Sequence, residues 1–499
     1  MSTNYGLRST GLLVFTGRMI SAFTGMLFTL MVARSLLPGA FGTQEVIVTL
    51  VTFSAYPVGL VAFWATRDIA RGRMVGRTAL VAGALLSSLG LVMYFGFTFV
   101  TYSRIASSVL PFLLGALLVP LSYWSAVANA IVTGFRPGVY GYSLVISELA
   151  KLGVAYESLY VYRLGIEGVI LALMAAYFVQ SVVSTFLVRL TTAERVDFAQ
   201  TRRWSRLAWL PAVSYLPTVL AVADTYVAAI GFGTSIVGYY QVAFLVASVV
   251  GYSSALAFSL YPMLLRGGDE RLPAVSIEFS LLFAIPMAAG CIALSGPILF
   301  LFGAKWLPGT MALEILASMF VFTTVSGIID QTLLGTEKVD VGERPSFWAL
   351  TRSNLLYVPV MNVLFGAAYV VSLYFALSYS FSRGLSTSST LALWGSVQLV
   401  ATVVFMLIKA RRARRYARLM PSPSVLYYAG AAVAMAAVVY LTSGMVAVQQ
   451  AGTLSYGARL VAVGVFGAAI YFGIVYALDS KFRDLARALL RKIWRGGLA

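Results

Sequence analysis

The amino-acid sequence predicts an all-α polytopic membrane protein with about fourteen transmembrane helices. Its 499 residues are 60% hydrophobic and only 11% charged, whereas the surface of a soluble domain needs about a quarter charged residues. The apolar residues are grouped in runs of roughly 20, the length of helix that crosses about 30 Å of hydrocarbon. The runs do not alternate at period two, so they are not the strands of a membrane β-barrel.

Each apolar run is expected to form one span. The runs cover residues 12–33, 42–64, 78–101, 108–133, 139–162, 165–188, 208–230, 236–260, 276–302, 309–333, 350–378, 389–409, 425–446 and 457–478. The first run contains Arg18 and is too long for the core of a signal peptide, so we interpret it as a permanent span.

The spans are predicted to form two pseudo-symmetric six-helix lobes around a central cavity, followed by two further helices. The first lobe covers residues 1–200 and the second covers residues 201–415, because the longest polar break in the first half follows span six. Spans thirteen and fourteen lie in residues 416–479. Residues 480–499 are predicted to form a basic amphipathic helix on the inner membrane surface, where it would contact anionic lipids.

Basic residues sort strongly to one side of this topology. With the N-terminus inside, 28 of the 36 Lys and Arg residues fall in inner loops or the tail, and six fall in outer loops. The positive-inside rule therefore predicts a multi-pass protein of the cytoplasmic membrane with both termini in the cytoplasm. The same asymmetry accounts for most of the net charge of +18, so we infer no nucleic-acid partner.

The sequence excludes several kinds of chemistry. It has one cysteine, Cys291, and no histidine, so it offers no disulfide within the chain and little basis for a zinc site. It has no GxxxxGK[ST] phosphate loop and no GxSxG nucleophile elbow. The expected outer loops are too short for a soluble catalytic domain. We therefore predict a protein that is not an enzyme and has no metal or cofactor; a coupling ion, H⁺ or Na⁺, stays open.

A shift of 196 residues places two outer hairpins on one another. "ARSLLPGAFGTQEV" (Ala33–Val46) then falls on "AIGFGTSIVGYYQV" (Ala229–Val242). Six spans separate the two segments, so the repeat is parallel and predicts two related lobes. We interpret both hairpins as parts of an outer gate. The candidate gate residues are Arg34, Pro38, Gly42 and Glu45 in the first hairpin and Gly238, Tyr239 and Tyr240 in the second.

Charged side chains inside apolar spans are costly and often mark transport pathways. Glu148 and Lys151 are three residues apart in span five, so they share a helix face and either pair structurally or form a polar cavity wall. Tyr162 returns to that face about three turns later. Arg18 either faces the cavity or extends to the interface. Asp224 follows two prolines in span seven and is a candidate to bind H⁺ or Na⁺.

The first hairpin and its two flanking spans resemble the opening of the polysaccharide-biosynthesis flippases. The usual pattern in that family is an apolar span, an Arg, a Leu and then Pro-x-x-Phe-Gly. The matching residues are Arg34, Leu36, Pro38, Phe41 and Gly42. The segment Val237–Val250 is similar to the second-half counterpart, and Leu301–Ala317 resembles the connection between spans nine and ten.

This resemblance implies membership of the superfamily that also contains the multidrug and toxin extrusion (MATE) transporters. It implies two lobes that alternate between inward-open and outward-open states, and fourteen spans resemble its lipid-linked-oligosaccharide branch. The implied function is a flippase for an oligosaccharide on polyprenyl phosphate or pyrophosphate, with glycosyltransferases or a polymerase of the same pathway as candidate partners. Two alternatives stay open: a cation-coupled multidrug or metabolite exporter, and a membrane-embedded glycan polymerase or ligase.

Overall fold

The computed structural model describes most of the chain. The described residues are 20–21, 23–105, 108–135, 140–188, 195–206, 208–257, 260–265, 269–337, 347–442, 444, 453–484 and 487. These residues form helices and connecting turns and contain no strand, which confirms the predicted all-α class. Arg18 and most of the basic tail lie outside the described residues.

Ten described helices are long and apolar enough to cross a membrane, and two further pairs of helices would each do so as one bent span. The predicted count of fourteen is therefore not confirmed. Two expected spans account for the difference. Span one begins outside the described residues and continues as the helix Phe23–Ser35, and span five is divided between a 17-residue α-helix and a π-helix.

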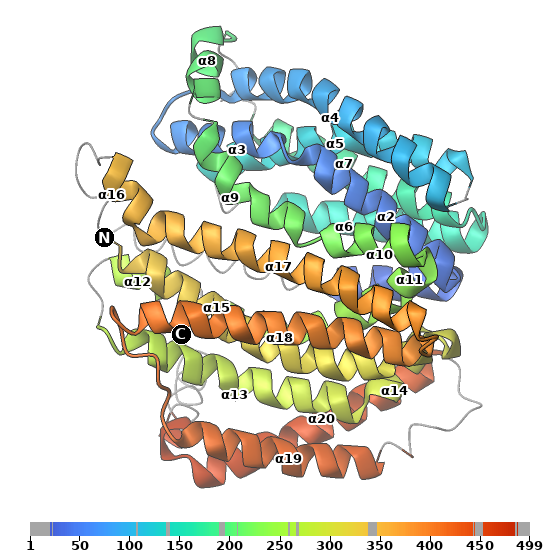
Figure 1. Cartoon of the computed structure of the whole chain (residues 1–499), viewed down its shortest axis with the longest axis vertical. Coiled ribbons are helices and arrows are strands. Elements are labelled where there is room, and N and C mark those ends of the chain that lie inside the picture. Colours follow the sequence, from blue (N-terminus) through green and yellow to red (C-terminus); the bar gives the residue numbers. More distant parts are fainter. Residues whose placement is uncertain are drawn as a thin grey trace, which may run out of the picture. The chain divides into compact units, whose positions relative to one another are not determined.

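The chain divides into two compact units, Met1–Val242 and Ala243–Ala499. The boundary lies within one helix, and the lobe boundary expected at residue 200 stays a prediction. After the helix Phe23–Ser35, the first unit contains α2 (Pro38–Ala55), α3 (Val58–Ala70), α4 (Gly76–Ile105), α5 (Val109–Phe135), α6 (Tyr140–Tyr156), the π-helix Glu157–Val161, α7 (Ile166–Leu187), α8 (Phe198–Arg206), α9 (Trp209–Leu220), α10 (Ala223–Phe232) and most of α11 (Thr234–Ala247) (Figure 1).

The second unit begins within α11. It contains the 3₁₀ helix Ser248–Ala257, α12 (Leu260–Leu265), α13 (Leu272–Ala293), α14 (Ser295–Phe302), the 3₁₀ helix Ala304–Gly309, α15 (Thr310–Gly335), α16 (Phe347–Arg352), α17 (Asn354–Ser382), α18 (Thr387–Ala413), α19 (Ser424–Thr442) and α20 (Thr453–Leu478). Helices α13, α15, α17 and α18 run side by side through this unit (Figure 1). A buried apolar cluster from α13, α19 and α20 holds the last two spans on α13.

The second span of each predicted half is interrupted. Tyr56 and Pro57 separate α2 from α3, which meet at a bend of 58°, because proline disrupts regular helical hydrogen bonding. The 196-residue shift places these residues on 252 and 253, which lie within the 3₁₀ helix Ser248–Ala257. A stretch of 3₁₀ helix this long is uncommon and often marks a hinge. The two halves therefore share an irregularity at the same place.

Candidate functional site

The two related hairpins meet in the first unit through two glycines. A methyl group added at Gly42 would overlap the carbonyl oxygen of Thr234 and lie 3.0 Å from the backbone nitrogen of Gly238. A methyl group added at Gly238 would in turn overlap the carbonyl oxygen of Pro38. The shift of 196 residues maps Gly42 onto Gly238 and Pro38 onto Thr234. Each hairpin therefore presents the same two positions to the other.

Local sequence explains how the two helix starts come this close. Pro38 occupies the first turn of α2, where its missing N–H costs no hydrogen bond. Gly233 stands between α10 and α11 with φ of +101°, a conformation that side-chain-bearing residues rarely adopt. Gly42 and Gly238 then lie four residues after the start of each helix and allow backbone contact.

The other predicted gate residues surround this contact at different depths. Tyr240 is fully buried, Tyr239 and Glu45 are half-buried, and Arg34 is exposed at the end of the preceding helix. Glu45 lies on α2, two turns from its start. The structure thus brings the two hairpins together, while the gating role of these residues stays a proposal.

Glu148 and Lys151 form an ion pair on α6. The Lys151 Nζ lies 2.7 Å from Glu148 Oε2, and both side chains are 12% exposed. Thr24 donates a 2.9 Å hydrogen bond to the same oxygen, and the ammonium lies 5.0 Å from the centre of the Phe28 ring. The pair therefore forms a polar cluster between α6 and the helix Phe23–Ser35. Its neutralised geometry agrees with the structural alternative.

Tyr162 is placed apart from this pair by a change of helix type. The chain is α-helical only to Tyr156 and then forms the π-helix Glu157–Val161. Tyr162 ends that helix, where its backbone N–H donates to the carbonyl of Glu157, and its side chain is 66% exposed. The predicted common face assumed α-helical periodicity throughout, which does not apply after Tyr156.

Asp224 is buried in the first turn of α10, directly after the bend between α9 and α10. Its Oδ1 accepts a 2.6 Å hydrogen bond from the backbone N–H of Thr225 and lies 3.3 Å from the Thr225 hydroxyl. Gln241 on α11 donates to that hydroxyl at 2.7 Å. The carboxylate therefore stabilises a helix start and belongs to a small polar network.

A second buried ion pair, in the second unit, was not predicted from the sequence. The Lys409 Nζ on α18 lies 2.9 Å from both carboxylate oxygens of Asp330 on α15. It also donates to Asn362 of α17 at 3.3 Å, and Lys409 is only 4% exposed. The three residues join three helices. The sequence offered no local signal, because Asp330 and Lys409 are 79 residues apart and Lys409 precedes a run of loop arginines.

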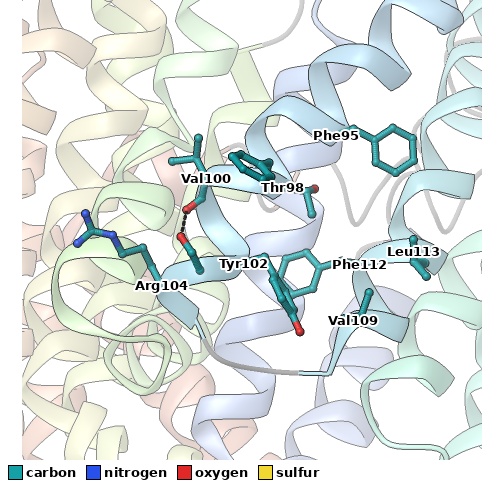
Figure 2. A pocket seen from close by; sticks show the side chains of 10 residues that line it. Phe95, Thr98, Val100, Tyr102, Arg104, Val109, Phe112 and Leu113 are labelled. Atoms are coloured by element: carbon teal, nitrogen blue, oxygen red, sulfur yellow. Dashed lines mark hydrogen bonds between the residues drawn. The ribbon is translucent and has the colours of Figure 1, made fainter.

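An apolar pocket of about 620 Å³ lies between the end of α4 and the start of α5. Figure 2 shows the rings of Phe95, Tyr102 and Phe112 along its wall, while Arg104 extends away from them at one edge. The Ser103 hydroxyl donates a 3.1 Å hydrogen bond to the Val100 carbonyl. Such a wall suits hydrocarbon and offers few groups for a sugar.

Comparisons with known proteins agree with this architecture. No family model matches the sequence. The chain is 23% identical over 357 residues to the protein named "Probable flippase AglR" from Haloferax volcanii, covering 66% of this chain and 72% of that protein. The structure of the present chain matches that of "Lipid II flippase MurJ, inward closed conformation" with a TM-score of 0.66 and 12% identity, over 96% of this chain and 99% of the other.

A second structural match is an inward-facing multidrug resistance MATE family transporter of the MOP superfamily. The TM-score is 0.58 at 13% identity, over 79% of this chain and 95% of that one. The resemblance predicted from the hairpin sequences is therefore confirmed, and the fold is the one shared by these flippases and exporters.

Proposed function

We propose that this chain, which has the fold of the MOP superfamily, is a flippase and not an enzyme. It would move an oligosaccharide linked to polyprenyl phosphate or pyrophosphate across the cytoplasmic membrane, with its termini on the cytoplasmic side. The relative named as a flippase supports the class of activity. The asymmetric distribution of basic residues supports the orientation. Enzymes that assemble the glycan inside and consume it outside are the partners that this activity requires.

The observation that carries the mechanism is the reciprocal contact of Gly42 and Gly238. In the proposed orientation it closes the outer side, and separation of the two helix starts opens that side. The interruptions at Tyr56–Pro57 and within Ser248–Ala257 provide the positions where the two second spans bend. Alternating access then needs no new fold, only separation at one end of these spans.

Substrate recognition is assigned to the Glu148–Lys151 pair together with Arg18. A phosphate group would replace Glu148 as the partner of the Lys151 ammonium, so the ammonium keeps a counter-charge throughout. Thr24 would continue to hold the released Glu148 carboxylate. The lipid chain stays in hydrocarbon, in contact with apolar helix surfaces.

Flipping in proteoliposomes tests the activity and the role of Lys151. The probe is a polyprenyl-pyrophosphate-linked oligosaccharide, and the readout is accessibility of its sugar to an external lectin. We expect wild type to flip the probe, Lys151→Met to lower the rate at least tenfold, and Lys305→Met to retain it as the matched control. Equal rates in both variants would reject the role of Lys151; absence of flipping by wild type would reject the function.

The gate has a separate test because Cys291 is the only cysteine. In a Cys291→Ser background, Leu36→Cys, at a position of the first hairpin that is 4% exposed, reports whether the hairpin becomes accessible to a membrane-impermeant thiol reagent. Gly42→Ala forces the two backbones apart, so we expect faster labelling and slower flipping. Gly231→Ala is the control, since a methyl group there meets nothing within 4 Å. Unchanged labelling in Gly42→Ala would contradict the gate.

A cation-coupled exporter is the second candidate, favoured by the buried Asp224 network. Efflux of a fluorescent cationic drug that is lost in Asp224→Asn would support it. Flipping of the lipid-linked probe that is unaffected by that variant would support the flippase.

A further inference from the structure

Helix α8 is held against the end of α3 by a buried carboxylate. Asp68, near the end of α3, is 2% exposed. It accepts a 2.9 Å hydrogen bond from the Trp204 indole and another from the Gln200 amide, both on α8. Two guanidinium groups lie beside it, that of Arg73 at 3.3 Å and that of Arg203 at 4.0 Å. We call this set the Asp68 latch.

The latch fixes the rotation of α8 about its own axis. Gln200 and Trp204 are four residues apart and face Asp68. Asp197 caps the helix start through the N–H groups of Ala199 and Gln200, and its own N–H donates to Thr78 of α4. Figure 1 shows α8 running across the direction of α3 and α4 at their ends.

The face of α8 turned away from the latch is both aromatic and basic. Phe198, Arg202 and Arg206 follow one another at four-residue intervals, so they form a single stripe. All three are exposed, Phe198 by 68%. Exposed arginines from the adjoining part of the first unit add to the positive field. They are Arg67, Arg71, Arg73 and Arg77.

We propose that this stripe of α8 binds the anionic headgroups of the membrane leaflet on its side. The positive-inside rule accounts for arginines on the cytoplasmic side of the membrane. It does not account for a buried carboxylate that holds α8 in one orientation. An exposed phenylalanine in line with arginines fits the headgroup boundary, where the ring is removed from water and the guanidinium groups meet phosphate. A free anion would satisfy the arginines and leave Phe198 in water.

The binding has a mechanical consequence. Helix α8 lies in the connection between the two predicted lobes, so an α8 held by both Asp68 and lipid restricts how that connection moves.

The test compares lipid retention by the purified full-length protein in detergent, measured by native mass spectrometry with equal phosphatidylglycerol and phosphatidylcholine. We expect wild type to retain phosphatidylglycerol preferentially and Arg202→Gln/Arg206→Gln to lose that preference at least fivefold. Arg411→Gln/Arg415→Gln, an equally charged change in the second unit, is the matched control and should retain it. Equal losses in both variants, or no preference in wild type, would overturn the proposal.

Two further measurements test the Asp68 latch and the identity of the bound anion separately. Asp68→Asn keeps every arginine but removes the negative charge and one acceptor oxygen, so it weakens the attachment of α8. We expect lower preference together with faster tryptic cleavage in residues 195–206. Inorganic pyrophosphate at millimolar concentration should displace little lipid from wild type, and complete displacement would reassign the stripe to a free anion. If Asp68→Asn does not fold, the arginine variants alone decide the outcome.

Discussion

The Glu148–Lys151 and Asp330–Lys409 ion pairs differ in what they connect. Glu148 and Lys151 lie one turn apart on α6, so their ion pair forms within one helix. Asp330 and Lys409 belong to α15 and α18, and Asn362 adds α17. The first pair neutralises a charge within one helix, whereas the second fixes three helices in register. Lys151 can therefore leave Glu148 for another anion without any separation of helices, as a substrate-binding side chain must. Lys409 cannot leave Asp330 in this way, because its pair joins different helices.

Loss of Lys409 should have the largest effect on stability. Lys409→Met leaves the Asp330 carboxylate without its counter-charge, and breaking a buried pair from one side costs about 3–5 kcal/mol. Unfolding by sodium dodecyl sulfate in mixed micelles measures the change. The double variant Asp330→Leu/Lys409→Met removes both charges and should recover most of the loss. A single variant as stable as wild type would show that this pair does not fix the helices.

Loss of Lys151 should destabilise the protein less. Lys151→Met leaves Glu148 with the Thr24 hydrogen bond and partial exposure, so we expect a loss of about 1–3 kcal/mol in the same assay, the cost of an incompletely satisfied polar group. Its effect on flipping should nevertheless exceed that of any equally destabilising substitution. If Lys151→Met proves as destabilising as Lys409→Met, the distinction between a local pair and an interhelical pair fails.

The contrast also explains what the sequence could predict. Spacing along a helix is visible in the sequence, so the Glu148–Lys151 pair and the apolar spans were predictable. The Asp330–Lys409 pair depends on packing of segments 79 residues apart, and Lys409 resembled the first of the loop charges that follow it. The Asp68 latch was hidden for the same reason, since Asp68 stands among arginines that were assigned to a loop.

The contact between the two hairpins was only partly predictable from the sequence. The 196-residue comparison related Gly42 to Gly238, but correspondence in sequence does not imply contact in space. The contact depends on how the helix starts pack. The break in α-helical periodicity after Tyr156 had no signal either, because no proline or glycine stands between Tyr156 and Val161.

The contact between Gly42 and Gly238 is arranged like an isologous dimer interface, although both surfaces belong to one chain. In a homodimer, one mutation alters both copies of every contact, so the interface must stay self-complementary. A single chain is free of that constraint, and its two surfaces can diverge around the shared glycines. The two surfaces differ here: Thr43 and Gln44 follow Gly42, whereas Tyr239 and Tyr240 follow Gly238. The junction combines the backbone geometry of a symmetric pair with two chemically different sides.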